Sequence, residues 1–159
     1  MIRSPAIRSQ HDQLVSFIEK CANDHSLDVF MLGHLGRYSC VSAAGFVENS
    51  LGEVFVDFIK QGSRKQVANF AIDTLRKIQN PKSYRIVEVA GRFHESLGSE
   101  LAIFLDADNK KRRDSIDSIM NNRHLIAHGK TSSITLSRVK AHLADVHDVI
   151  VFIEKAIYR

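Results

Sequence analysis

The segment LSRVKAHLADVHDVIVFIEKAI, Leu136 to Ile157, decides the fold class. Its aliphatic residues alternate three and four positions apart, which is the spacing of a buried seam in a helical bundle. Thr135, just before the segment, has the side chain of a helix N-cap residue. The predicted seam consists of Leu136, Val139, Leu143, Val146, Ile150, Ile153 and Ile157. The sequence therefore predicts a long helix whose apolar face is covered by other helices.

Helical spacing also recurs through the chain before this segment. The predicted elements are helices over residues 4–22, 27–60, 64–79 and 83–97, a short turn or helix over residues 101–105, and a helix from about residue 110 to Gly129. Glycines 33 and 36 predict a kink or split in the second helix. Asn80-Pro81 and Gly98 are expected to end the third and fourth helices, and residues 106–109 to cap the last one listed.

Two of these helices have predicted core stripes that matter below. The stripe of the second helix is Val41, Ala44, Glu48, Leu51, Phe55 and Phe58, and that of the third is Val67, Ala71, Leu75 and Ile78. Glu48 is the only charged residue on either stripe. The run Ser42 to Gly45 has the small side chains that close helix contact requires.

Composition agrees with a folded helical protein. The chain has 159 residues, 44% hydrophobic and 25% charged, with only two prolines, which favours a globular over a disordered chain. We expect one all-α domain over residues 1–159, an up-and-down bundle of five to seven helices.

Composition also bears on the cellular compartment of the protein and on the charge of its partners. Its first twelve residues are too polar for a signal peptide, no apolar run approaches the roughly 20 residues of a membrane span, and Cys21 and Cys40 lack metal-ligand spacing. We expect a soluble, cytoplasmic protein without a membrane partner. The net charge of +4 is a mild bias towards an anionic partner such as nucleic acid.

The string NRHLIAHG, Asn122 to Gly129, interrupts the apolar face of the helix that carries it. At 100° per residue Arg123 points the same way as the aliphatic residues before it. A buried guanidinium needs a charged partner, and Glu48 is the candidate for a structural ion pair. The alternative is that Arg123 awaits an anionic ligand.

The two histidines of this string flank the apolar face. His128 lies in the last helical turn, where the helix C-terminus favours its protonated form and Arg123 opposes it. Such a balance suits proton transfer near neutral pH. His124 and His128 also have the i,i+4 spacing by which two imidazoles bind zinc, although no third ligand is evident.

The same string resembles a known family motif. Arg123 and His128, separated by four residues near the end of the penultimate helix, resemble the Rx4-6H motif of HEPN domains, and the string resembles the RNxIAHG form of the RiboL-PSP subgroup. The segment RYSCVSAAGFVE, Arg37 to Glu48, resembles that subgroup's second-helix pattern. The resemblance covers most of the chain, from about residue 10 onward.

This resemblance implies a metal-independent endoribonuclease without a cofactor, in which two copies of the motif line one cleft of a homodimer. Arg123 would hold the scissile phosphate and His128 would transfer a proton, with Asn122, His124 and Glu48 in support. Many such domains are toxins or phage-defence effectors, so an antitoxin or a neighbouring defence protein is an implied partner. The alternative is a non-catalytic HEPN domain that binds RNA, nucleotide or a protein.

Two positions depart from the family's pattern. His124 stands where a small polar residue such as asparagine is common. Lys130 stands where some toxin members place a tyrosine that a partner modifies, which puts that form of neutralisation in doubt.

A basic run, Lys110, Lys111, Arg112 and Arg113, lies roughly 15 Å before Arg123 on the same predicted helix. It is a candidate RNA-binding surface through salt-sensitive phosphate contacts. The competing interpretation is a solvated first turn neutralised by neighbouring aspartates.

Overall fold

The structure is a computed structural model that describes residues 2–75 and 79–159. Its helices are α1 (Pro5–Ala22), α2 (Val29–Gly62), α3 (Lys65–Leu75), α4 (Ser83–Phe93), α5 (Glu95–Ala127) and α6 (Leu136–Ile157). No strand occurs in the part of the chain that is described. The predicted all-α bundle is confirmed.

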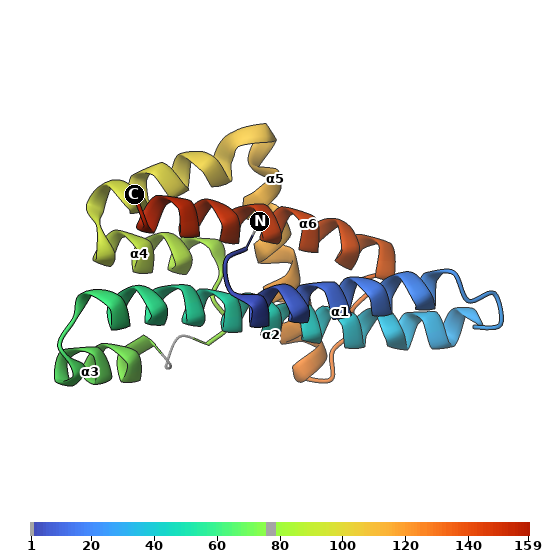
Figure 1. The fold of residues 1–159 in the computed structure, drawn as a ribbon. Coiled ribbons are helices and arrows are strands. Elements are labelled where there is room, and N and C mark those ends of the chain that lie inside the picture. The colour runs from blue at the N-terminus through green and yellow to red at the C-terminus, as the bar shows by residue number, and fades with distance from the viewer. Residues whose placement is uncertain (1, 76–78) are drawn as a thin grey trace.

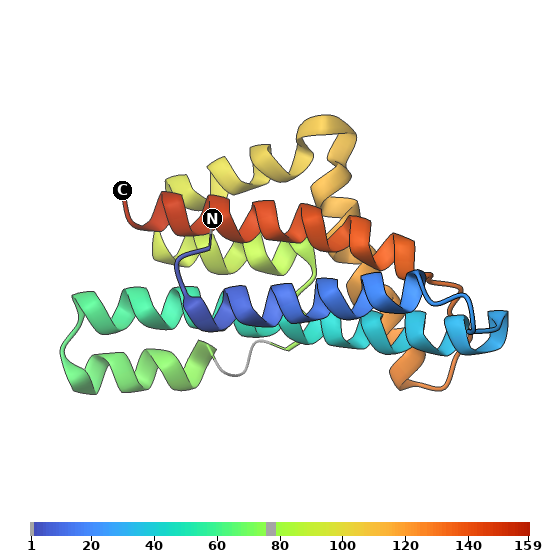
Figure 2. The same ribbon diagram turned by 45° about the vertical axis from the view of Figure 1, so that its right-hand side comes forward.

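The helices pack around α2 and α6. In Figures 1 and 2, α1 lies along α2 and α6 runs beside this pair, while α3 packs against the far end of α2. The second half of α5 crosses behind α2 and α6, and its C-terminal end emerges below α2. The end of α5 that carries Arg123 and His128 therefore lies at the edge of the bundle.

The α6 seam forms the centre of the core, as predicted. Its side chains from Leu136 to Ile153 are at most 6% exposed, and only Ile157 is partly exposed. Thr135 accepts a hydrogen bond from the Arg138 amide and is the N-cap of α6. Both the helix and its start follow from local sequence.

The α5 region differs from its prediction. Gly98 does not end a helix: α4 ends at Phe93, and Gly98 lies within α5, packed against Gly91. Residues 101–105 belong to α5 too. A break follows at residues 107–110, of which the last three have φ between 53° and 64°. Residues 106–109, predicted to cap a new helix, therefore lie at a break between the two halves of α5, which we call the elbow.

The second and third helices also differ from expectation. α2 continues unbroken through Gly33 and Gly36, and Val41 on its predicted stripe is 41% exposed. In α3 Ala68 and Ile72 are buried, whereas Val67 is 59% exposed, because α3 turns a different face to α2 than periodicity suggested. The predicted stripe residue Ile78 lies outside the described residues.

None of the helices in the described ranges combines the length and the apolar character needed to cross a membrane.

Candidate functional site

The end of α5 is fixed by backbone hydrogen bonds that follow from its sequence. The Gly129 amide donates to the Ile126 carbonyl and the Lys130 amide donates to the Leu125 carbonyl. Gly129 has a φ of +64°, so this is the paired C-cap of the Schellman motif. The predicted stop at Gly129 is confirmed, and it leaves His128 as the capping residue of an exposed helix end.

Arg123 lies one turn before this cap, opposite α2. Its amide contacts the Cys40 thiol, which also donates to the Ile119 carbonyl at 3.6 Å. The Arg123 side chain is half-buried. Within the described ranges, no hydrogen bond or ion pair of its guanidinium occurs. Burial raises the pKa of the Cys40 thiol to about 11, so this neighbour is not a nucleophile at neutral pH.

The predicted ion pair between Glu48 and Arg123 is not made among the described residues. Glu48 instead accepts a hydrogen bond of 2.5 Å from the Asn80 amide. The reason is height along α2: Arg123 lies beside Cys40, and Glu48 follows eight residues later, about 12 Å at 1.5 Å per residue. Helical spacing predicts which way a side chain points, but it does not predict which position along a neighbouring helix that side chain meets. Within residues 2–75 and 79–159, Arg123 is therefore a cation without the carboxylate partner that a structural ion pair requires.

His124 and His128 lie side by side at the exposed end of α5. Their ring centroids are 4.4 Å apart, and the rings are inclined by 58°. Among the residues described, no group of three or more metal-ligating side chains occurs. The i,i+4 pair predicted from sequence exists, but the third protein ligand of a structural zinc site is not found in that part of the chain.

Asn122 connects the end of α5 to the loop that follows it. Its Nδ2 donates to the Ser118 carbonyl at 2.8 Å, and its Oδ1 accepts from Ser132 Oγ at 2.7 Å. Ser132 is buried. Asn122 thus links the end of α5 to the loop that follows it, and both polar atoms of its side chain have hydrogen-bond partners within the protein.

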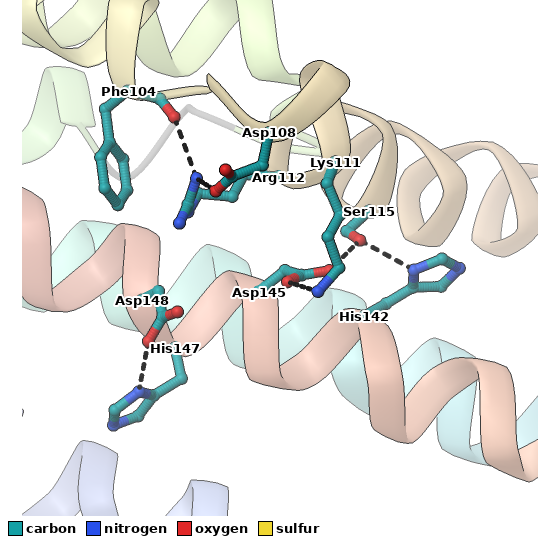
Figure 3. A network of polar contacts seen from close by, with 9 residues as sticks. All are labelled: Phe104, Asp108, Lys111, Arg112, Ser115, His142, Asp145, His147 and Asp148. Atoms are coloured by element: carbon teal, nitrogen blue, oxygen red, sulfur yellow. Dashed lines mark hydrogen bonds and ion pairs between the residues drawn. The ribbon is translucent and has the colours of Figure 1, made fainter. Parts of the chain in front are cut away.

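The basic run does not form an open cationic surface. Lys111 Nζ lies 3.0 Å from Asp145 Oδ1, Arg112 pairs with Asp108 at 2.9 Å, and Arg113 Nε pairs with Asp106 Oδ1 at 2.5 Å. The Arg112 guanidinium also lies over the Phe104 ring (Figure 3). These ion pairs favour the interpretation that aspartates neutralise the basic run. They also show that the run stabilises the elbow of α5. Lys110 lies in the elbow itself, with a φ of 64°.

A buried polar network between α5 and α6 was not anticipated from the sequence. Figure 3 shows Ser115 between His142 and Asp145. Ser115 Oγ donates to Asp145 Oδ2 at 2.7 Å, and His142 Nδ1 lies 2.9 Å from the same Oγ. Since the serine proton is directed at the carboxylate, Nδ1 of His142 must be the donor to the serine oxygen. The network ties the second half of α5, which carries Arg123, to α6.

The sequence does hint at this network, because its polar residues lie next to apolar stripe residues. Asp145 lies next to Val146 of the α6 seam and is 6% exposed, and Ser115 lies next to Ile116 and is 3% exposed. Polar residues at the margin of two facing apolar stripes are candidates for cross-helix hydrogen bonds, because buried polar groups are paired. Which of these residues face each other depends on how α5 packs on α6, and helical spacing within one helix does not give that alignment.

The network predicts a pH dependence of stability. Burial lowers the pKa of His142 from its ordinary value of 6.5; Asp145 opposes this shift and Arg138 reinforces it. Protonation therefore favours the unfolded chain, so this contribution is complete above pH 6.5 and is lost as the pH falls towards the lower pKa of the folded state. In thermal melts, His142→Asn is expected to lose stability less steeply than wild type below pH 6.5.

The control for this prediction is His25→Asn, a change at an exposed loop histidine. It is expected to keep the wild-type dependence on pH. Equal slopes for wild type and His142→Asn would contradict the role assigned to His142.

In residues 2–75 and 79–159 the chain forms six helices, and the penultimate one carries an arginine and a histidine near its exposed end, as the resemblance to HEPN domains implies. The family model described as RiboL-PSP-HEPN matches residues 7–159. The chain belongs to the RiboL-PSP-HEPN family. No curated protein and no solved structure matches the chain. Membership in this family supports an RNA-cleaving or RNA-binding role.

Proposed function

We propose that the protein is a metal-independent endoribonuclease whose site is formed by Arg123 and His128 at the end of α5. The observation that carries the proposal is the half-buried Arg123 guanidinium, which has no ion pair within the described ranges. A cation in that position is stabilised by an anion from outside, and a phosphodiester is the anion that HEPN membership favours.

Each residue has a distinct part in the proposed reaction. Arg123 donates hydrogen bonds to the scissile phosphate and stabilises the charge that develops on its oxygens. His128 lies one turn further along, exposed at the helix cap, and transfers a proton to or from the 2′-hydroxyl or the leaving oxygen. Because DNA lacks that hydroxyl, the reaction is specific for RNA.

A second cation lies near this site and is a better candidate for an RNA contact than the basic run. Arg37 lines an open hollow together with residues of the loop after α5, including Ser132 and Ser133. Ser132 is the residue bound to Asn122. Among the described residues Arg37 has no carboxylate partner. We assign to Arg37 a contact with a phosphate beside the scissile one.

The site at the edge of the bundle is open, which is the arrangement expected if a second copy completes it. We propose a homodimer in which the two α5 ends line one cleft. A toxin or phage-defence role, with an antitoxin or neighbouring defence protein as partner, accords with the family. Light scattering of the purified chain tests the dimer: a monomer at the concentrations used for cleavage would contradict it.

The second candidate is a HEPN domain that binds RNA, a nucleotide or a protein partner without cleaving RNA. The exposed His128, accessible for proton transfer, favours the first candidate. Purified protein is incubated with structured and unstructured RNA in EDTA, and both the products and the retained RNA are measured. Cleavage in EDTA is expected. Retention of intact RNA would establish the binding alternative, and cleavage that requires added metal would contradict the metal-independent reaction.

A further inference from the structure

The imidazole nitrogen atoms of His124 and His128 make no hydrogen bond or ion pair within the described residues. Both side chains are exposed, and their centroids are 4.4 Å apart. One helical turn holds them in place, and the C-cap at Gly129 fixes that turn. The pair therefore offers two nitrogen donors on one side of the helix end.

Another close pair of histidines is less suited to bind an ion. The rings of His11 and His147 are 5.1 Å apart. Their Nδ1 atoms lie 3.1 Å and 3.5 Å from carboxylate oxygens of Asp12 and Asp148. The His11 side chain is only 19% exposed and packs against Phe46. A hydrated ion has better access to His124 and His128.

We propose that His124 and His128 together bind one late first-row divalent ion, such as Zn²⁺ or Ni²⁺, and that the bound ion stops RNA cleavage. Imidazole nitrogens ligate zinc at about 2.0–2.1 Å, and they favour zinc and nickel over magnesium, which prefers oxygen. The chain supplies two ligands, so water completes the coordination. Binding is reversible and weaker than in a structural zinc site, which suits a regulator.

The inhibitory effect rests on the proton transfer proposed for His128. Coordination occupies the nitrogen lone pair with which the ring would accept a proton. The bound ion is also a second positive charge, held by the residue that follows Arg123 in the chain, and it competes with the guanidinium for the phosphate. An occupied pair therefore disables the site without changing the fold.

The test begins with metal binding, which does not depend on RNA cleavage. The full chain, without a histidine tag, is titrated with Zn²⁺ against a colorimetric indicator, beside His124→Asn, His128→Asn and His147→Asn. Competition by the wild type is expected to be lost in the first two variants and kept in the third, and Mg²⁺ is expected not to displace Zn²⁺. Binding that survives either of the first two changes, or disappears in His147→Asn, overturns the site.

The second arm measures cleavage by the wild type with Zn²⁺ and after EDTA is added. Zn²⁺ is expected to stop cleavage and EDTA to restore it. Full cleavage, or faster cleavage, with the pair saturated by Zn²⁺ overturns the regulatory part. If the wild type cleaves no RNA even in EDTA, the proposed function fails by itself, and the indicator titration still decides whether the metal site exists.

Discussion

Arg123→Ala is expected to lower the rate of RNA cleavage by roughly 100- to 1000-fold, the effect of removing one charge-stabilising donor from an active site. The guanidinium has no ion pair within the described ranges, so its loss leaves no carboxylate unpaired. The free energy of unfolding should change by about 1 kcal/mol or less. A single-turnover assay and a thermal melt on the same sample measure both quantities.

Two further variants separate the geometry of Arg123 from its charge. Arg123→Lys keeps the charge but loses the planar pair of donors, so it is expected to cleave at a rate between those of wild type and Arg123→Ala. Arg92→Ala removes an exposed positive charge on α4 that pairs with Glu88, and it should cleave like wild type. An equal loss in Arg92→Ala and Arg123→Ala would show that net charge, not the site, is being measured.

Gly36→Ala is expected to destabilise the fold by about 1–3 kcal/mol, the usual cost of overpacking. A Cβ atom at Gly36 would lie 2.7 Å from the Ile134 carbonyl oxygen, so either α2 or the loop before α6 must move. That loop carries Ser132, the partner of Asn122. RNA cleavage is therefore expected to fall together with the melting temperature.

Gly45→Ala is the matched control on the same helix. A Cβ atom there meets no atom within 4 Å, so alanine should leave stability unchanged or raise it by up to about 1 kcal/mol through helix propensity. If Gly36→Ala melts at the same temperature as Gly45→Ala, the close contact between α2 and the loop does not contribute to stability, and the prediction is wrong. The prediction from sequence that Ser42 to Gly45 mediates close helix contact is wrong at Gly45.

The parts of the fold that local chemistry controls were predictable from sequence. Thr135 and Gly129 fix the start of α6 and the end of α5 through hydrogen bonds to backbone groups within a few residues, and the α6 seam follows from its period. The elbow of α5 was not predictable in this way. Asp108, Asn109 and Lys110 adopt positive φ without a glycine, and their conformation is held by ion pairs such as Lys111 with Asp145 of α6.

Sequence proposed the residues of the candidate site but could not give their surroundings. The family motif predicted Arg123 and His128 as site residues, and that assignment stays a prediction; the i,i+4 spacing placed His124 beside His128, and the structure confirms this neighbourhood. Pairing Arg123 with Glu48 was wrong because helical period fixes the direction of a side chain and not its level against a neighbouring helix. Arg37 and the network of Ser115 with His142 also depend on how the helices pack, so they required the structure.

The most direct test of the proposed reaction is cleavage of matched oligonucleotides in EDTA by the wild type and His128→Ala. One oligonucleotide is all RNA, and the other carries a 2′-deoxy substitution at the position that the wild type cleaves. The wild type is expected to cut the RNA and leave the substituted position intact, while His128→Ala cuts neither. Cleavage at the 2′-deoxy position, or undiminished cleavage by His128→Ala, would contradict an RNA-specific reaction that depends on His128.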